Sequence, residues 1–111
     1  MALIYKICNV NLWEKAKAQG HLIGAETDLR DGFIHFSTAE QLGETLRLHF
    51  EGVENLLLLT IDGCRLDLKW EPARNGNLFP HLYDILPLSA VLRVNPILLD
   101  DDGHHILSSQ L

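Results

Sequence analysis

The sequence has few cysteines, no long apolar run and no cluster of basic residues. Its two cysteines, Cys8 and Cys64, form no CxxC pair, and a chain that is 47% hydrophobic does not need disulfides to hold its core. No apolar run approaches the about 18 residues of a membrane helix. Nine Lys and Arg face fifteen Asp and Glu, giving a net charge of −6. We therefore expect reduced thiols, no membrane-spanning segment and no nonspecific binding to nucleic acid.

The first residues lack the basic stretch, apolar core and cleavage site of a signal peptide, so we expect a cytoplasmic protein. The length of 111 residues suits one compact domain over residues 1–111 and is too short for two. With 47% hydrophobic and 22% charged residues, the composition is that of an ordinary globular protein.

Hydrophobic spacing and turn residues predict a mixture of strands and helices. Alternation and β-branched residues predict strands over residues 3–8, 33–36, 55–62, 66–71 and 90–94. Helical spacing predicts a helix over 12–19 and another that begins after Ser37 and ends near Gly52. Residues 20–32 show no clear period and predict a long surface connection, and the prolines of 78–88 predict an ordered irregular segment. The strand at 55–62 has no polar face and is expected at the centre of the sheet.

Six histidines suggest metal binding, but the sequence contains no HExxH, HxxxH or Cys/His knuckle. We therefore expect no metal site. Neither cysteine has a histidine at a recognised catalytic spacing, so both are interpreted as small buried thiols.

His35, Ser37 and Thr38 form the first candidate site. They lie where a predicted strand ends at the start of a helix, and the free N–H groups and dipole of a helix start attract phosphate or carboxylate. The alternative is that Ser37 caps the helix and His35 bonds a neighbour.

A second candidate lies between residues 70 and 83. Glu71, Arg74, His81 and Tyr83 combine a carboxylate, a guanidinium, an imidazole and a phenol, a mixture that can hold a polar aromatic ligand. The alternative is a loop that is locked by proline and aromatic packing.

Several strings resemble the small bacterial family known as domain of unknown function 952. They cover nearly the whole chain and are Ile4-Tyr5-Lys6-Ile7, Trp13 with Ala16 and Gly20, residues 31–41 (DGFIHFSTAEQ), Leu68-Lys69-Trp70-Glu71, and residues 78–83 (LFPHLY). That family is similar in fold to the ADP-ribosyltransferase superfamily, especially to RNA 2′-phosphotransferases. The resemblance implies an α+β fold, a strongly bent mixed or antiparallel sheet with two main helices.

The resemblance also implies a site. RNA 2′-phosphotransferases hold one histidine on the first strand and another in a His-x-Ser string, which matches His35 and Ser37 here. Lys6 stands where many relatives have the first histidine, and no residue matches the superfamily's late catalytic glutamate. The resemblance makes NAD a candidate ligand.

We expect a nucleotide or another phosphorylated compound to bind in a cleft near the first two strands. His35 would orient it, Ser37 and Thr38 would meet its phosphate, Lys6 would neutralise charge and His81 would exchange a proton. Three readings stay open at this point. They are a divergent transferase, a noncatalytic binding module, which the missing glutamate favours, and a protein-interaction module with an exposed apolar patch.

Overall fold

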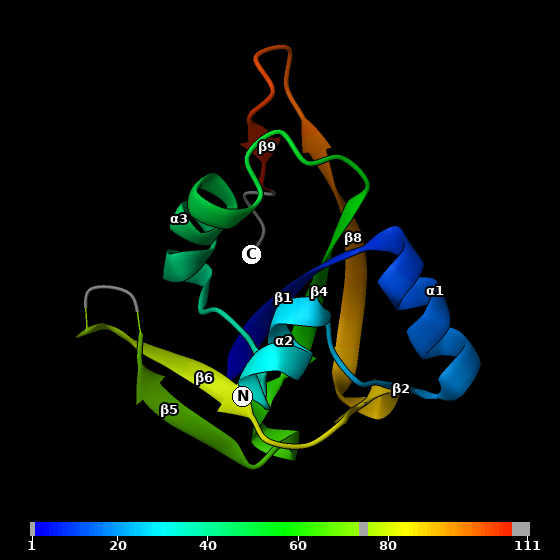
Figure 1. The fold of residues 1–111 in the computed structure, drawn as a ribbon. Helices are drawn as coiled ribbons and strands as arrows, with labels where there is room; N and C mark the ends of the chain where they lie inside the picture. Colours follow the sequence, from blue (N-terminus) through cyan, green and yellow to red (C-terminus); the bar gives the residue numbers. More distant parts are fainter. Residues whose placement is uncertain (1, 74–75, 108–111) are drawn as a thin grey trace.

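The computed structural model describes residues 2–73 and 76–107 (Figure 1). Within these ranges it has three helices, α1 (Val10–Gln19), α2 (Glu26–Asp31) and α3 (Ala39–His49). The strands are β1 (Leu3–Asn9), β2 (His21–Leu22), β3 (Ile34–His35), β4 (Leu56–Asp62), β5 (Leu68–Pro72), β6 (Leu78–Leu82), β7 (Leu86–Pro87), β8 (Val91–Leu99) and β9 (His105–Ile106). The expected α+β class is confirmed, with one short helix besides the two long ones.

The strands form a strongly curled antiparallel sheet, a half-barrel. One part has the order β1-β4-β8-β9, another has the order β3-β6-β5, and β2 pairs with β7. Backbone hydrogen bonds between Tyr5 and Ser37, in both directions, join β1 to the segment that follows β3. β5 and β6 extend away from β4 and β8 (Figure 1).

Side chains of β1 and β4 alternate between two hydrophobic clusters on opposite faces of the sheet. Ile4 and Leu59 pack in the cluster that includes Ala16 of α1. Tyr5 and Leu58 pack in the cluster that α3 covers. The apolar sequence of β4 is explained by this burial on both faces, as expected for a central strand.

Two sequence predictions are wrong. Residues 20–32 are not one long connection, because they contain β2 and α2. Their pattern hides the helix because the fully buried side chain of α2 is Asp28, a polar residue, and helical periodicity is read from apolar ones. Residues 78–88 are not irregular, because β6 is the central strand of its sheet. Pro80 is tolerated there because its carbonyl accepts from Phe36 N, while its ring nitrogen needs no acceptor.

Both predicted helices differ at their starts or ends. α1 begins at Val10, two residues before the predicted start, because the Asn9 side chain accepts a hydrogen bond from Leu12 N at 2.7 Å. α3 ends at His49, and Phe50 follows as its cap. Among the described residues, no helix has the length and apolar character to cross a bilayer.

Candidate functional site

A cleft of about 740 Å³ lies where the edge of β1 meets α2, α3 and the paired strands β3 and β6. Its polar part is formed by Lys6, Thr27, Asp28, Arg30, Asp31, His35 and His81. Its remaining wall is largely apolar and aromatic, with Tyr5, Ile7, Phe36, Leu48, Phe50 and Phe79, beside Ser37, Thr45, His49 and Ala73. The cleft thus has a charged end and an apolar end, and its volume suits a small molecule.

At the charged end, the Asp28 carboxylate binds the Lys6 ammonium deep inside the protein. The two side chains are 1% and 7% exposed, and Asp28 Oδ2 lies 2.8 Å from Lys6 Nζ. Asp28 Oδ1 accepts from Lys6 Nζ, from His35 N and from His35 Nδ1. Asp28 Oδ2 also accepts from Ala25 N at 2.7 Å. Asp28 therefore joins β1, α2 and β3 at one point.

This environment keeps Asp28 ionised. Burial by itself would raise the pKa of its carboxyl, because a low-dielectric interior disfavours charge. The hydrogen bond from His35, the charge and hydrogen bonds of Lys6, and the Ala25 N–H outweigh burial and hold the pKa of Asp28 well below its usual range. Asp28 is therefore a fixed anion at the base of the cleft.

Both nitrogens of the His35 ring contact carboxylates. Nδ1 lies 2.6 Å from Asp28 Oδ1, and Nε2 lies 3.0 Å from Asp31 Oδ2. The Nδ1 contact is a hydrogen bond with the buried carboxylate, and the Nε2 contact is at ion-pair distance from the second one. Asp28 is buried, whereas the side chains of His35 and Asp31 are 37% and 35% exposed. His35 is thus held from the inside by Asp28 and from the cleft rim by Asp31.

His81 lies directly across from His35 on the neighbouring strand, with the two ring centroids 5.4 Å apart. Glu71 Oε1 lies 2.8 Å from His81 Nδ1, so this nitrogen donates and Nε2 is left to contact other groups. Tyr83 donates to the same Glu71 oxygen at 2.6 Å, and the Phe33 ring stacks on His81 at 4.1 Å. The Tyr83 hydrogen bond, followed by that of His81, lowers the pKa of Glu71. His81 is fixed in position and orientation by these neighbours.

Ser37 and Thr38 already use their backbone N–H groups within the protein. Ser37 N donates to Tyr5 O at 2.9 Å, and Thr38 N donates to Gln41 Oε1 at 3.0 Å. The Ser37 hydroxyl lies 3.4 Å from Thr45 Oγ1 on the cleft wall. At the start of α3, the hydroxyl of Ser37 is therefore the group that reaches the cleft.

The structure brings together four of the residues that the sequence singled out. His35, Ser37, His81 and Lys6 line one cleft, although they are far apart in the sequence. Three others, Thr38, Glu71 and Tyr83, are absent from its wall, and Glu71 and Tyr83 lie behind His81. Arg74 lies outside the described residues.

Comparison with known proteins gives the family. The family model described as "Protein of unknown function (DUF952)" matches residues 7–94, which include His35 and His81. The chain belongs to the DUF952 family. No curated protein matches its sequence.

The DUF952 chain is similar to protein CC0527 from Caulobacter crescentus. A crystal structure of CC0527 shares 48% sequence identity and superposes with a TM-score of 0.90, covering 95% of this chain and 94% of that one. A solution NMR structure of CC0527 gives 47% identity and a TM-score of 0.86, covering 100% of this chain and 97% of that one. The curled sheet and its helices are therefore shared with a solved protein.

Sequence reasoning missed Asp28, Asp31 and Phe33 in the DUF952 chain. One signal was available, since alternation along the strand predicted over residues 3–8 places Lys6 on the same face as Ile4 and Cys8. A buried ammonium needs a carboxylate partner, and Glu26, Asp28 and Asp31 lie in the segment that was interpreted as a loop. Which of the three pairs with Lys6 depends on the orientation of α2.

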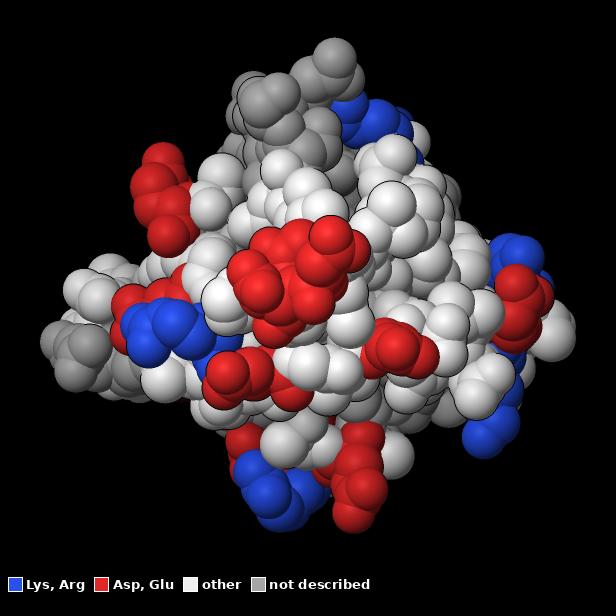
Figure 2. Space-filling model, turned by 90° about the horizontal axis from the view of Figure 1, so that it is seen from above, with Lys and Arg blue, Asp and Glu red and all other residues white. Residues whose placement is uncertain are grey.

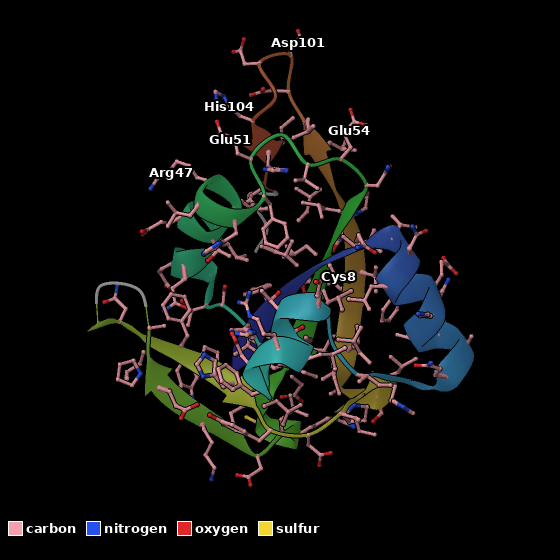
Figure 3. All side chains as sticks on the ribbon, viewed as in Figure 1. Cys8, Arg47, Glu51, Glu54, Asp101 and His104 are labelled. Carbon is pink, nitrogen blue, oxygen red and sulfur yellow. The ribbon has the colours of Figure 1, made fainter. Side chains whose placement is uncertain are left out.

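Two other groups with reactive or ligating side chains lie away from the cleft wall. Cys8 is buried in the core beside α1, and burial raises its pKa to about 11 (Figure 3). Within the described ranges, Asp100, Asp102 and His104 place potential ligand atoms within 4.8 Å of one another, all exposed. Asp100 Oδ1 accepts from the backbone N–H of Asp102 and of His104, which explains this cluster as a hydrogen-bonded turn. Acidic side chains gather at this end of the molecule (Figure 2).

Proposed function

We propose that the cleft of the DUF952 chain binds a nucleotide or another phosphorylated small molecule, with His35 and His81 contacting its phosphate. The burial and hydrogen bonding of His81 carry the proposal. His81 is 5% exposed, Glu71 holds its Nδ1, and its Nε2 has no partner among the described residues. A buried polar atom without a partner is costly and indicates a ligand or a bound water.

The position of His35 supports the same ligand. The two rings are cross-strand neighbours in edge-to-face contact and both line the cleft, so in this proposal one phosphoryl group contacts both imidazoles. The Ser37 hydroxyl offers a further donor from the cleft wall. The apolar end, with Tyr5 and Phe50, provides aromatic surface for the rest of a nucleotide.

Lys6 has a different role in this proposal from the one that its sequence position suggested. Its ammonium is already paired with Asp28, so its charge is largely used inside the protein. Lys6 then acts as a positioning residue, because it holds the carboxylate that orients His35. The groups that would contact phosphate are then the two histidines and the Arg30 guanidinium, which also lines the cleft.

Binding, rather than transfer, is the function proposed here. An ADP-ribosyltransferase-like arrangement would make NAD a ligand, but the cleft wall within the described residues has Asp28 and Asp31 as its carboxylates, and both contact His35. Asp28 is held by Lys6, Ala25 and His35 and is not free to stabilise a cation-like ribose, which needs a fixed anion nearby, and the one-third exposed Asp31 is not such a fixed anion. His81 Nε2 is the group that can exchange a proton with a bound ligand.

Calorimetry with AMP, ADP and NAD tests the proposal. At least one nucleotide should bind the wild type, and His35→Ala and His81→Ala should each weaken it by about tenfold or more, which is about 1.4 kcal/mol per factor of ten. His104→Ala is the matched control, because His104 is exposed near the turn between β8 and β9 (Figure 3). If none of the three nucleotides binds the wild type, the proposal is refuted.

Chromatography of NAD after long incubation separates binding from catalysis. The proposal expects intact NAD. Release of nicotinamide that disappears in His35→Ala would instead identify a transferase or hydrolase.

A further inference from the structure

The Nε2 atom of His35 faces the cleft, yet it is occupied. Asp31 Oδ2 lies 3.0 Å from it, and Asp31 itself lines the cleft. In the proposed function a phosphate oxygen contacts this same nitrogen. A carboxylate oxygen and a phosphate oxygen are both anionic, so they cannot occupy the same place beside Nε2.

We propose that Asp31 competes with the ligand for His35 Nε2 and thereby sets the affinity of the cleft for anions. This inference rests on the proposed function. Asp31 acts as an internal stand-in for the ligand's phosphate, and a ligand binds by displacing it. Asp31 is then a specificity-determining residue, because it weakens anionic ligands while leaving neutral ligands unaffected.

The two carboxylates on His35 differ in how readily they can leave. Asp28 is buried and accepts several hydrogen bonds from three other residues, so moving it would break the junction of β1, α2 and β3. Asp31 is the last residue of α2, is one-third exposed and has one other charged contact, with Arg30 Nε at 3.2 Å. Exposed ion pairs of this kind are weak, so Asp31 can turn away from His35 and keep its contact with Arg30.

Gly32 follows Asp31 as the C-cap of α2. Its φ of +85° ends α2 in the left-handed region, and nothing lies within 4 Å of the position of a Cβ there. The end of α2 therefore borders open space.

The test compares AMP with adenosine, measured by calorimetry on the wild type, Asp31→Asn and Asp31→Ala. Removing the competing carboxylate should tighten AMP by about two- to fivefold, the factor that an exposed ion pair supplies. Adenosine, which has no phosphate, should bind all three proteins equally. The Ala variant also removes the hydrogen bond that an Asn side chain could still accept from His35.

Glu26→Gln is the control for overall charge. Glu26 lies on the same helix, is exposed and does not line the cleft, so this variant loses one negative charge without changing the His35 contact. At about 0.15 M salt, where screening acts over about 8 Å, Glu26→Gln should leave AMP binding unchanged. An equal gain in Glu26→Gln and Asp31→Asn would overturn the inference, because it would show a general charge effect.

Three results distinguish this inference from the proposed function. If AMP binds the wild type and both Asp31 variants tighten it, both stand. If AMP binds the wild type but the variants bind it equally or more weakly, Asp31 does not compete, and the proposed function alone survives. If AMP binds none of the proteins, both fail for this ligand. ¹⁵N NMR of the histidine rings gives a separate readout. AMP should move the Nε2 signal of His35, whereas the signals of His104 and His105, which do not line the cleft, should stay unchanged.

Discussion

Replacing Asp28 with Asn removes the counter-ion of a lysine that lies inside the protein. Lys6 Nζ has Asp28 as its hydrogen-bond partner among the described residues, at 2.8 and 3.0 Å, and its side chain is 7% exposed. Breaking a buried ion pair by removing one partner costs about 3–5 kcal/mol, because the remaining charge is buried and unpaired. We expect Asp28→Asn to lower the free energy of unfolding by about this amount.

Lys6→Met should cost less than Asp28→Asn. Without Lys6, the Asp28 carboxylate still accepts hydrogen bonds from Ala25 N and from the backbone and ring of His35. The free energy of unfolding lost in Lys6→Met is then closer to the value for hydrogen bonds to a charged group, about 1.5–3 kcal/mol. The order of the two costs follows from how many partners each residue keeps.

Urea unfolding followed by circular dichroism measures these costs, with the double variant closing the cycle. The double variant should be more stable than the sum of the two single losses predicts, by about 1–3 kcal/mol. A larger loss for Lys6→Met than for Asp28→Asn would refute the reasoning. So would strict additivity, because it would mean that the two side chains do not interact.

Three further predictions concern acid stability, backbone space and thiol reactivity. The folded state lowers the pKa of Asp28, so the contribution of Asp28 to the free energy of unfolding is complete above its ordinary pKa near 4 and is lost as the pH falls below that value. Urea melts from pH 5 to pH 2 should therefore show a smaller loss of stability for Asp28→Asn than for the wild type. A Cβ at Gly24, where φ is +128°, would lie 2.7 Å from Asp28 Cβ, so Gly24→Ala should destabilise by about 2 kcal/mol and more than Gly20→Ala, which meets nothing within 4 Å. Iodoacetamide at pH 8 should label exposed Cys64 but not Cys8, whose pKa is about 11, until the protein unfolds; mass spectrometry of native and unfolded samples checks this.

Local patterns in the sequence determined the long elements. The uninterrupted apolar run of β4 required burial on both faces, and the helical spacing of Leu42 and Leu46 required one buried face of α3. These signals are strong because each depends on residues close together in the chain. The family strings around His35 and His81 likewise marked the residues that line the cleft.

The tertiary structure decided how those residues are used. β6 lies between β3 and β5 although it contains Pro80, and no local pattern encodes this pairing. The short α2 is not recognisable from apolar spacing, because what it buries is Asp28, and that carboxylate is stable inside the protein only with Lys6 and His35 beside it.

The contacts in the candidate site also depend on the tertiary structure. The sequence predicted that His35, Ser37 and His81 are site residues, but the partner of each polar group depends on which strands lie side by side. Lys6 pairs with Asp28, and Asp31 lies 3.0 Å from the outer nitrogen of His35, because folding brings α2 against β1 and β3. A charge in the interior is satisfied by whatever the chain places within about 3 Å of it, and only the three-dimensional arrangement fixes that choice.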